Sequence, residues 1–292
     1  MILLWVLALF LALLPAVLML WYIRHLDKYE PEPWSLMAAA FFAGCLSVIP
    51  AAVVEGLLGS TATSGFLGSV YTAFFVVGLT EELCKGAFTF AAVWRRPHFN
   101  EIMDGIVYFG VGHMGFAVPE NLKYVLLGSG GDPAASLMIA FVRSTTAVPL
   151  HIVVGMIMGY HLGAARFMRG GWKRLEHVGM ALGLPVLLHG AYDVAALNQN
   201  VGSINTLGDL LTVGFSSALM YAAVVALWLF LIPRVRHAQA ASPWRPGAAE
   251  ALPAAPVPCA HCGAPYPVAA NFCPTCGEPI SRRSQLRQSP LA

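Results

Sequence analysis

Long apolar runs alternate with short polar segments along this chain. Seven runs have the roughly 20 residues that a helix needs to cross a hydrocarbon core of about 30 Å. Backbone N–H and C=O groups cannot stay unpaired in lipid, so each run is expected to be a helix. The pattern predicts an all-α polytopic membrane protein, with spans at about residues 2–23, 35–58, 66–94, 104–127, 136–166, 177–198 and 207–232.

The loops between the runs differ in their basic residues. Lys and Arg follow the first, third, fifth and seventh runs, whereas the loops 59–64, 128–135 and 198–205 contain neither. Lys and Arg collect in cytoplasmic loops, so we expect the N-terminus outside the cell and the C-terminus in the cytoplasm. The first run lacks a charged segment before it and a small-residue cleavage site after it. It is therefore interpreted as a retained helix rather than a signal peptide.

Composition supports a membrane location. Of the 292 residues, 58% are hydrophobic and 11% are charged, whereas roughly 25% are charged in a soluble domain. The lipid bilayer is therefore the expected surrounding. The net charge is +2 and no basic stripe carries interleaved aromatic residues, so direct nucleic-acid binding is not expected.

The composition changes sharply after the last run. We predict a transmembrane domain over residues 1–235, an Ala/Pro-rich linker over 236–257, a zinc-binding module over 258–280 and a disordered tail over 281–292. The zinc prediction rests on two Cys-x-x-Cys pairs separated by ten residues. Two such pairs complete a tetrahedral four-thiolate site for structural Zn²⁺. Its ligands would be Cys259, Cys262, Cys273 and Cys276.

A closed thiolate site leaves no open position for catalysis, so the module is expected to hold itself together with the metal and to bind a cytoplasmic partner.

Ionisable residues inside the apolar runs are the strongest indication of function. A charge at the bilayer centre costs roughly 2.5–3.5 kcal/mol even on insertion scales, so such residues are rare and usually functional. The set consists of Glu81, Glu82 and Lys85 in the third run, Glu120 in the fourth, His151 in the fifth, and His189 and Asp193 in the sixth.

Each member also has a plain structural explanation. Glu81 and Lys85 are four residues apart and face the same side of a helix, so they can form an internal ion pair. This leaves Glu82 without an obvious helical partner, and two carboxylates with one ammonium favour a functional role. His189 and Asp193 are also four apart, which suits a metal pair or a base with its orienting group.

The other polar residues of the runs are less informative. Glu120 can pair with Lys123 or Arg143 if it has no catalytic role, and a lone histidine such as His151 is often a packing residue. We interpret three further residues as structural because they lie near run ends or without companions: Glu55, His113 and His161.

The order of these groups resembles the PrsW family of intramembrane proteases, which is similar to the CAAX prenyl endopeptidases and bacteriocin-processing membrane proteins. The resemblance covers about residues 1–235 and includes the segments 24–34 and 104–108. It rests mainly on Glu81-Glu82-x-x-Lys85, Phe116-x-x-x-Glu120-Asn121, His151 and His189-x-x-x-Asp193.

The resemblance implies a bacterial membrane protease that cleaves a membrane-anchored protein, with Lys85, Phe116 and Asn121 in supporting roles. The best-known role of the family is the first cut in an anti-sigma factor. Cleavage in a bilayer needs an activated water and a group that stabilises the oxyanion. In the version that we favour, Glu81 or Glu82 is the base, His151 or His189 shuttles the proton, and His189 or Asn121 binds the oxyanion.

A metal-dependent version is also open. In it, His151 and His189 bind Zn²⁺ together with a carboxylate from Glu120 or Asp193, and Glu82 is the base. No His-Glu-x-x-His motif is present to decide. A membrane sensor or transporter that uses the same buried charges is the alternative function, but we see no internal repeat and no matching pair of broken helices.

Overall fold

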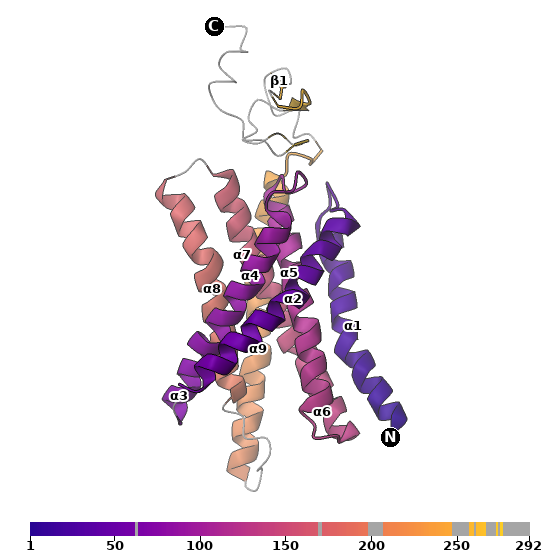
Figure 1. Cartoon of the computed structure of the whole chain (residues 1–292), viewed down its shortest axis with the longest axis vertical. Helices are drawn as coiled ribbons and strands as arrows, with labels where there is room; N and C mark the ends of the chain where they lie inside the picture. Colours follow the sequence, from indigo (N-terminus) through magenta and orange to yellow (C-terminus); the bar gives the residue numbers. More distant parts are fainter. Residues whose placement is uncertain are drawn as a thin grey trace.

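Two of the seven membrane-crossing segments are built from more than one helix. The computed structural model describes residues 1–61, 64–168, 171–197, 207–246, 257–259, 261–266, 273 and 275–276. In these ranges, seven helical segments are long and apolar enough to span a membrane, which confirms the predicted fold class. Figure 1 shows them as a bundle with the N-terminus at one end and the end of the last helix at the other.

The helices and strands are α1 (Ile2–Leu26), α2 (Trp34–Gly59), α3 (Phe66–Tyr71), the π-helix η1 (Thr72–Gly78), α4 (Leu79–Val93), α5 (Ile102–Leu127), α6 (Pro133–Thr145), α7 (Ala147–Phe167), α8 (Trp172–Leu197), α9 (Leu207–Ala241), β1 (Val257–Pro258) and β2 (Pro265–Tyr266).

The third segment changes its helical type just before its ionisable residues. α3 continues into η1, a π-helix, and η1 continues into α4, whose first turn carries Glu81 and Glu82. A π-helical turn is rare and occurs most often at functional sites. The hydrophobic pattern of the run did not predict this change in winding.

The fifth segment, expected as one helix, is broken between α6 and α7. Thr146 at the junction has φ −125° and ψ −66°, outside the helical region. Pro149 explains the break, because its ring clashes with the carbonyl group four residues earlier and it has no N–H to donate. The hydroxyl groups of Thr145 and Thr146 both donate to the carbonyl oxygen of Val142, at 3.1 and 2.7 Å, in addition to the N–H of Thr146 at 3.0 Å.

α5 is the central helix of the bundle, and every residue from Met103 to Ala117 is buried. It packs between α2 and α7. Gly105 lies against the backbone of Gly159 so closely that a Cβ atom on either would collide with the other's carbonyl oxygen. Small residues of this kind allow close backbone approach, which drives helix association in a membrane where lipid tails are as apolar as Leu.

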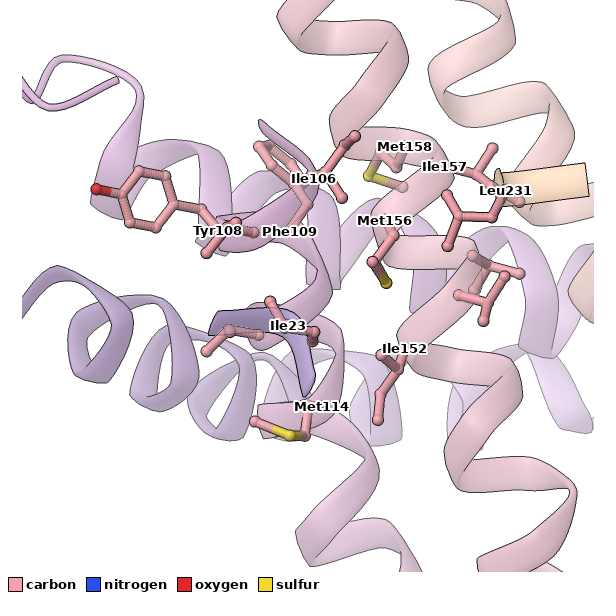
Figure 2. Packing of buried hydrophobic residues seen from close by; sticks show 14 of the residues in the cluster. Ile23, Ile106, Tyr108, Phe109, Met114, Ile152, Met156, Ile157, Met158 and Leu231 are labelled. Carbon is pink, nitrogen blue, oxygen red and sulfur yellow. The ribbon is translucent and has the colours of Figure 1, made fainter. Parts of the chain in front are cut away.

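Larger side chains fill the space beside this glycine contact. Figure 2 shows Ile106 and Phe109 of α5 facing Met156 of α7, whereas Ile157 lies beside Leu231 of α9, all of them buried. By contrast, α1 exposes Phe10 and other apolar side chains on its outer side, as expected of a surface in contact with lipid.

The last helix extends further than its apolar run. α9 continues past Pro233 to Ala241, and Gln239 donates from Nε2 to the carbonyl oxygen of Leu26 at 2.7 Å. Good helix formers after the proline explain the extension. The tail 281–292 lies outside the described residues.

Candidate active site

Ionisable side chains from three helices meet inside the bundle. Glu81, Glu82 and Lys85 come from α4, and they are joined by His151 of α7 and His189 of α8. All five side chains are buried. Residues that the sequence placed on separate runs therefore form one cluster.

Lys85 is the centre of this cluster. Its Nζ atom lies 2.6 Å from Glu82 Oε1, 3.0 Å from Glu81 Oε2 and 3.0 Å from His151 Nδ1. The ammonium group also lies 4.6 Å from the centroid of the Phe116 ring, a cation–π distance. One cation thus holds both glutamates, as a buried charge needs.

Glu82 is fully engaged, contrary to the expectation that it would lack a partner. Oε1 contacts Lys85 and also His189 Nδ1, at 2.9 Å, and Oε2 lies 2.9 Å from His113 Nε2. Glu82 and Lys85 are three residues apart, and residues at this spacing face each other on a helix as those four apart do.

His113, interpreted as structural from the sequence, contacts this cluster through Glu82. Its Nδ1 atom lies 2.8 Å from the carbonyl oxygen of Phe109, which can only accept, so Nδ1 carries a proton. The contact between Nε2 and Glu82 then needs a further proton on one of those two atoms. The missed signal was spacing, because His113, Phe116 and Glu120 follow each other by three and four residues on one helical face.

Two carboxylate oxygens lie beside the second ring nitrogen of His189. Glu82 can only accept at His189 Nδ1, so that nitrogen donates and Nε2 is left with a lone pair in the neutral ring. Nε2 lies 3.4 Å from Asp193 Oδ2 and 3.8 Å from Glu81 Oε2. The Glu81 oxygen is paired with Lys85, whereas the Asp193 oxygen is buried and accepts no hydrogen bond from the residues that the structure describes. A second proton on His189 or a metal ion is therefore needed between Nε2 and Asp193.

Glu120 forms a separate branch of the site. Its Oε2 atom lies 2.9 Å from Arg143 Nη2 and 3.0 Å from His151 Nε2. The arginine pairing is the structural alternative foreseen from the sequence, and the histidine contact joins Glu120 to the cluster. His151 also packs its ring 4.8 Å from that of His189.

Asn121 does not join the cluster. Its Nδ2 atom donates to the carbonyl oxygen of Ala12 at 2.9 Å, and its Oδ1 atom accepts from Arg143 Nε at 3.1 Å. It therefore ties α5 to α1 and orients Arg143. The expected role of Asn121 as an oxyanion donor has no geometric support.

The donor set fits a metal ion. Glu81, His151 and His189 each offer one ligand atom, and these atoms lie within 4.8 Å of one another. Two imidazoles and one carboxylate are a common ligand set of catalytic zinc. The contact of Glu82 with the far nitrogen of His189 fits such a site, because a ligand histidine is usually oriented by a carboxylate at its other ring nitrogen. The carboxylate of this group is Glu81, rather than Glu120 or Asp193 as the sequence argument proposed.

The four cysteines of the C-terminal segment also lie together. Their sulfur atoms are within 4.8 Å of one another, close enough to hold a metal ion. Hydrogen bonds from backbone N–H groups of Cys262 and His261 lower the pKa of the Cys259 thiol to about 7, which favours the thiolate. Gly263, with φ +73°, makes the turn that follows the first pair.

A family model described as PrsW family intramembrane metalloprotease matches residues 32–231. The chain is 35% identical over 179 residues to Protease PrsW of Bacillus subtilis (strain 168), covering 61% of this chain and 78% of the relative. It is 33% identical to the protein of that name from Clostridioides difficile (strain 630), covering 63% and 76%. Protease PrsW of Oceanobacillus iheyensis is 29% identical, over 77% of this chain and 92% of the relative. No solved structure matches the chain.

Proposed function

The chain belongs to the PrsW family of intramembrane metalloproteases, and from this premise we propose that its buried cluster hydrolyses a peptide bond in a membrane-anchored protein. The substrate class that fits a site within helices is a single-pass protein whose chain can unwind near the cluster. An anti-sigma factor is one such protein. The supporting observation is the meeting of His189 Nε2 with oxygens of Glu81 and Asp193, of which the Asp193 oxygen accepts no hydrogen bond from described residues.

Zn²⁺ would be held by Glu81, His151 and His189. The spacing of His189 and Asp193 in the sequence had suggested a different carboxylate ligand. When bound, the metal lowers the pKa of its water and polarises the substrate carbonyl group. The family description favours this version over the metal-free one.

The remaining polar residues have distinct tasks. Glu82 and His113 are positioning residues, since Glu82 holds the ring of His189 and is itself held by His113. Lys85 keeps the two adjacent glutamates together at the site. Asp193 has a carboxylate oxygen that accepts no hydrogen bond from described residues, so it is the group that can accept a proton from the attacking water.

We assign the C-terminal module a structural zinc ion at Cys259, Cys262, Cys273 and Cys276, with the transmembrane domain ending near residue 235 and the linker and module following it. The distribution of Lys and Arg supports a cytoplasmic location of this module and of the end of α9, with the N-terminus outside. A cytoplasmic protein is the expected partner of the module.

Two measurements test these assignments. Membrane proteomes of host cells with the wild type or with Glu81→Gln are compared, and a single-pass protein should accumulate uncut only in the variant. Glu176→Gln, which removes an exposed carboxylate, is the matched control. If both variants leave every membrane protein processed as in the wild type, the protease assignment at Glu81 is wrong.

The second measurement is zinc content of the purified full-length chain. We expect two zinc ions per chain in the wild type and one after Cys259→Ser with Cys262→Ser. Adding His189→Ala to that double variant should remove the last zinc ion. Retention of this zinc after the histidine is removed would contradict the metal site inside the bundle.

A further inference from the structure

A second group of buried carboxylates lies at the end of the bundle where α1 ends and α5 begins. Asp27 directly follows α1, Glu32 precedes α2, and Asp104 lies in the first turn of α5. Each offers one oxygen, and these oxygens lie within 4.8 Å of one another. The three side chains are 3%, 3% and 0% exposed. The proposed protease function uses none of them.

One oxygen of Asp104 is fixed by the backbone. Oδ2 accepts the N–H groups of Asn100, at 2.5 Å, and Glu101, at 2.7 Å, as the cap of α5. The cap leaves Oδ1 of Asp104 buried, and it accepts no hydrogen bond from any described residue. The cap thus orients the carboxylate without using its second oxygen.

Glu32 and Asp27 repeat this arrangement. Glu32 Oε2 accepts a hydrogen bond from the hydroxyl group of Tyr108, whose side chain points away from α7 in Figure 2. Asp27 Oδ1 accepts the N–H of Glu30 at 3.4 Å. The other oxygens, Glu32 Oε1 and Asp27 Oδ2, are buried and accept nothing from the described part of the chain. Each carboxylate is therefore held by one oxygen and offers the other.

Two arginines, Arg24 and Arg166, lie near these carboxylates, and each also contacts other groups. Glu30 and Glu101 stand close enough to Asp27 to repel it, so five carboxylates lie close together here. Arg24 attracts Asp27 but donates from Nη1 to the Glu32 carbonyl oxygen, at 2.6 Å, and covers the Trp34 ring at 4.5 Å. Arg166 attracts Asp104 and is stacked on Trp94 and Phe99.

Ionisation of these groups is costly without a further cation. Asp27, Glu32 and Asp104 each have one buried oxygen that accepts no hydrogen bond from the described part of the chain. Glu32 and Asp104 also interact directly through their side chains, although neither is a donor when ionised. Either protons or a metal ion must lie between such oxygens.

We propose that Asp27, Glu32 and Asp104 bind a hard divalent cation, Mg²⁺ or Ca²⁺. Carboxylate oxygens are the ligands of these ions, whereas zinc and copper prefer nitrogen or sulfur. The ion would join the connection between α1 and α2 to the start of α5, the helix that carries His113 and Glu120 further along. Shared protons are the competing occupant of the same space.

Equilibrium dialysis of the full-length protein in detergent tests the proposal. The protein is first stripped with a chelator, and binding of radioactive Ca²⁺ is measured at constant ionic strength, with Mg²⁺ as competitor. We expect one Ca²⁺ per chain, lost in Asp27→Asn and in Glu32→Gln. Asp27→Asn keeps a carbonyl oxygen for the Glu30 N–H, and Glu32→Gln keeps an acceptor for Tyr108.

Two controls separate this site from the others. Glu81→Gln alters the bundle interior and Glu176→Gln removes an exposed carboxylate at the same end, and both should bind Ca²⁺ like the wild type. No bound Ca²⁺ or Mg²⁺, or unchanged binding in Asp27→Asn and Glu32→Gln, would overturn the proposal and favour shared protons. Loss of binding in Glu81→Gln alone would place the ion elsewhere.

A measurement on the wild type guards against variants that do not fold. Its thermal midpoint should rise with Mg²⁺ or Ca²⁺ more than with KCl of equal ionic strength, because an ion that binds only the folded state stabilises it. An equal response to all three salts contradicts a bound divalent ion. Failure of the protease assays would leave each of these binding results unaffected.

Discussion

The two buried carboxylate clusters differ in what stands opposite their oxygens. In the bundle interior, Lys85 contacts both Glu81 and Glu82, and histidines complete the contacts of Glu82. At the bundle end, Asp27 and Glu32 have backbone and hydroxyl donors on one oxygen only. Burial is similar in both places. The unmatched oxygens, rather than burial itself, indicate where a ligand belongs.

The largest expected effect is on catalysis. Glu81→Gln keeps the size of the side chain and removes the charge that would hold the metal. We expect proteolysis to fall by at least the ~10²–10⁴-fold typical of a lost acid–base group, measured as cleavage of a reconstituted substrate. Asp27→Asn, at the other cluster, should retain cleavage when Mg²⁺ is present. If the two variants lose cleavage activity equally, the two clusters do not differ in function.

The next effect is on stability. Lys85→Met leaves two buried carboxylates without their ammonium group, and breaking a buried pair costs about 3–5 kcal/mol. A lower midpoint of denaturant or thermal unfolding measures the loss. Lys85→Arg is the matched variant, and it should recover part of the stability. An unaltered midpoint in Lys85→Met would mean that the glutamates are already neutral.

A smaller effect is expected for the positioning residue His113. Groups that orient a metal ligand contribute about 10–100-fold to affinity or activity, so His113→Ala should lower kcat by that factor and leave KM unchanged. His113→Gln retains a donor toward Glu82 and should recover part of kcat. A change in KM alone would indicate a merely structural role.

The smallest effect sharpens the contrast between the clusters. Glu32→Gln in chelator should change the unfolding midpoint little or raise it, because like charges are relieved and replacing buried charges by neutral groups is often neutral or stabilising. The same variant should lose the response to Ca²⁺. A large destabilisation without divalent ions would show that the charge of Glu32 is already balanced by the protein.

The sequence predicted the spans and most of the residues that meet in the candidate site, since burial in lipid makes each ionisable residue conspicuous. It did not predict the break at Thr146 or the π-helix η1, because both depend on local winding rather than hydrophobicity. His113 was missed because only its distance from the run centre was weighed, and not its helical face. The sequence also left Asp27 and Glu32 in an ordinary polar loop, since only tertiary packing against α5 buries them.

The π-helix η1 also sets the rotational register of α4. An α-helix turns by about 100° per residue, and a π-helical turn accommodates an extra residue within an otherwise continuous helix. Glu81 and Glu82 follow this turn directly, so its winding determines their azimuth toward α7 and α8. Returning Thr72–Gly78 to α-helical winding without removing a residue would rotate both carboxylates by about 100°. Removing one residue together with the π-helical turn would instead leave their direction unchanged. The extra residue and the π-helical winding therefore set together the direction in which the two glutamates point.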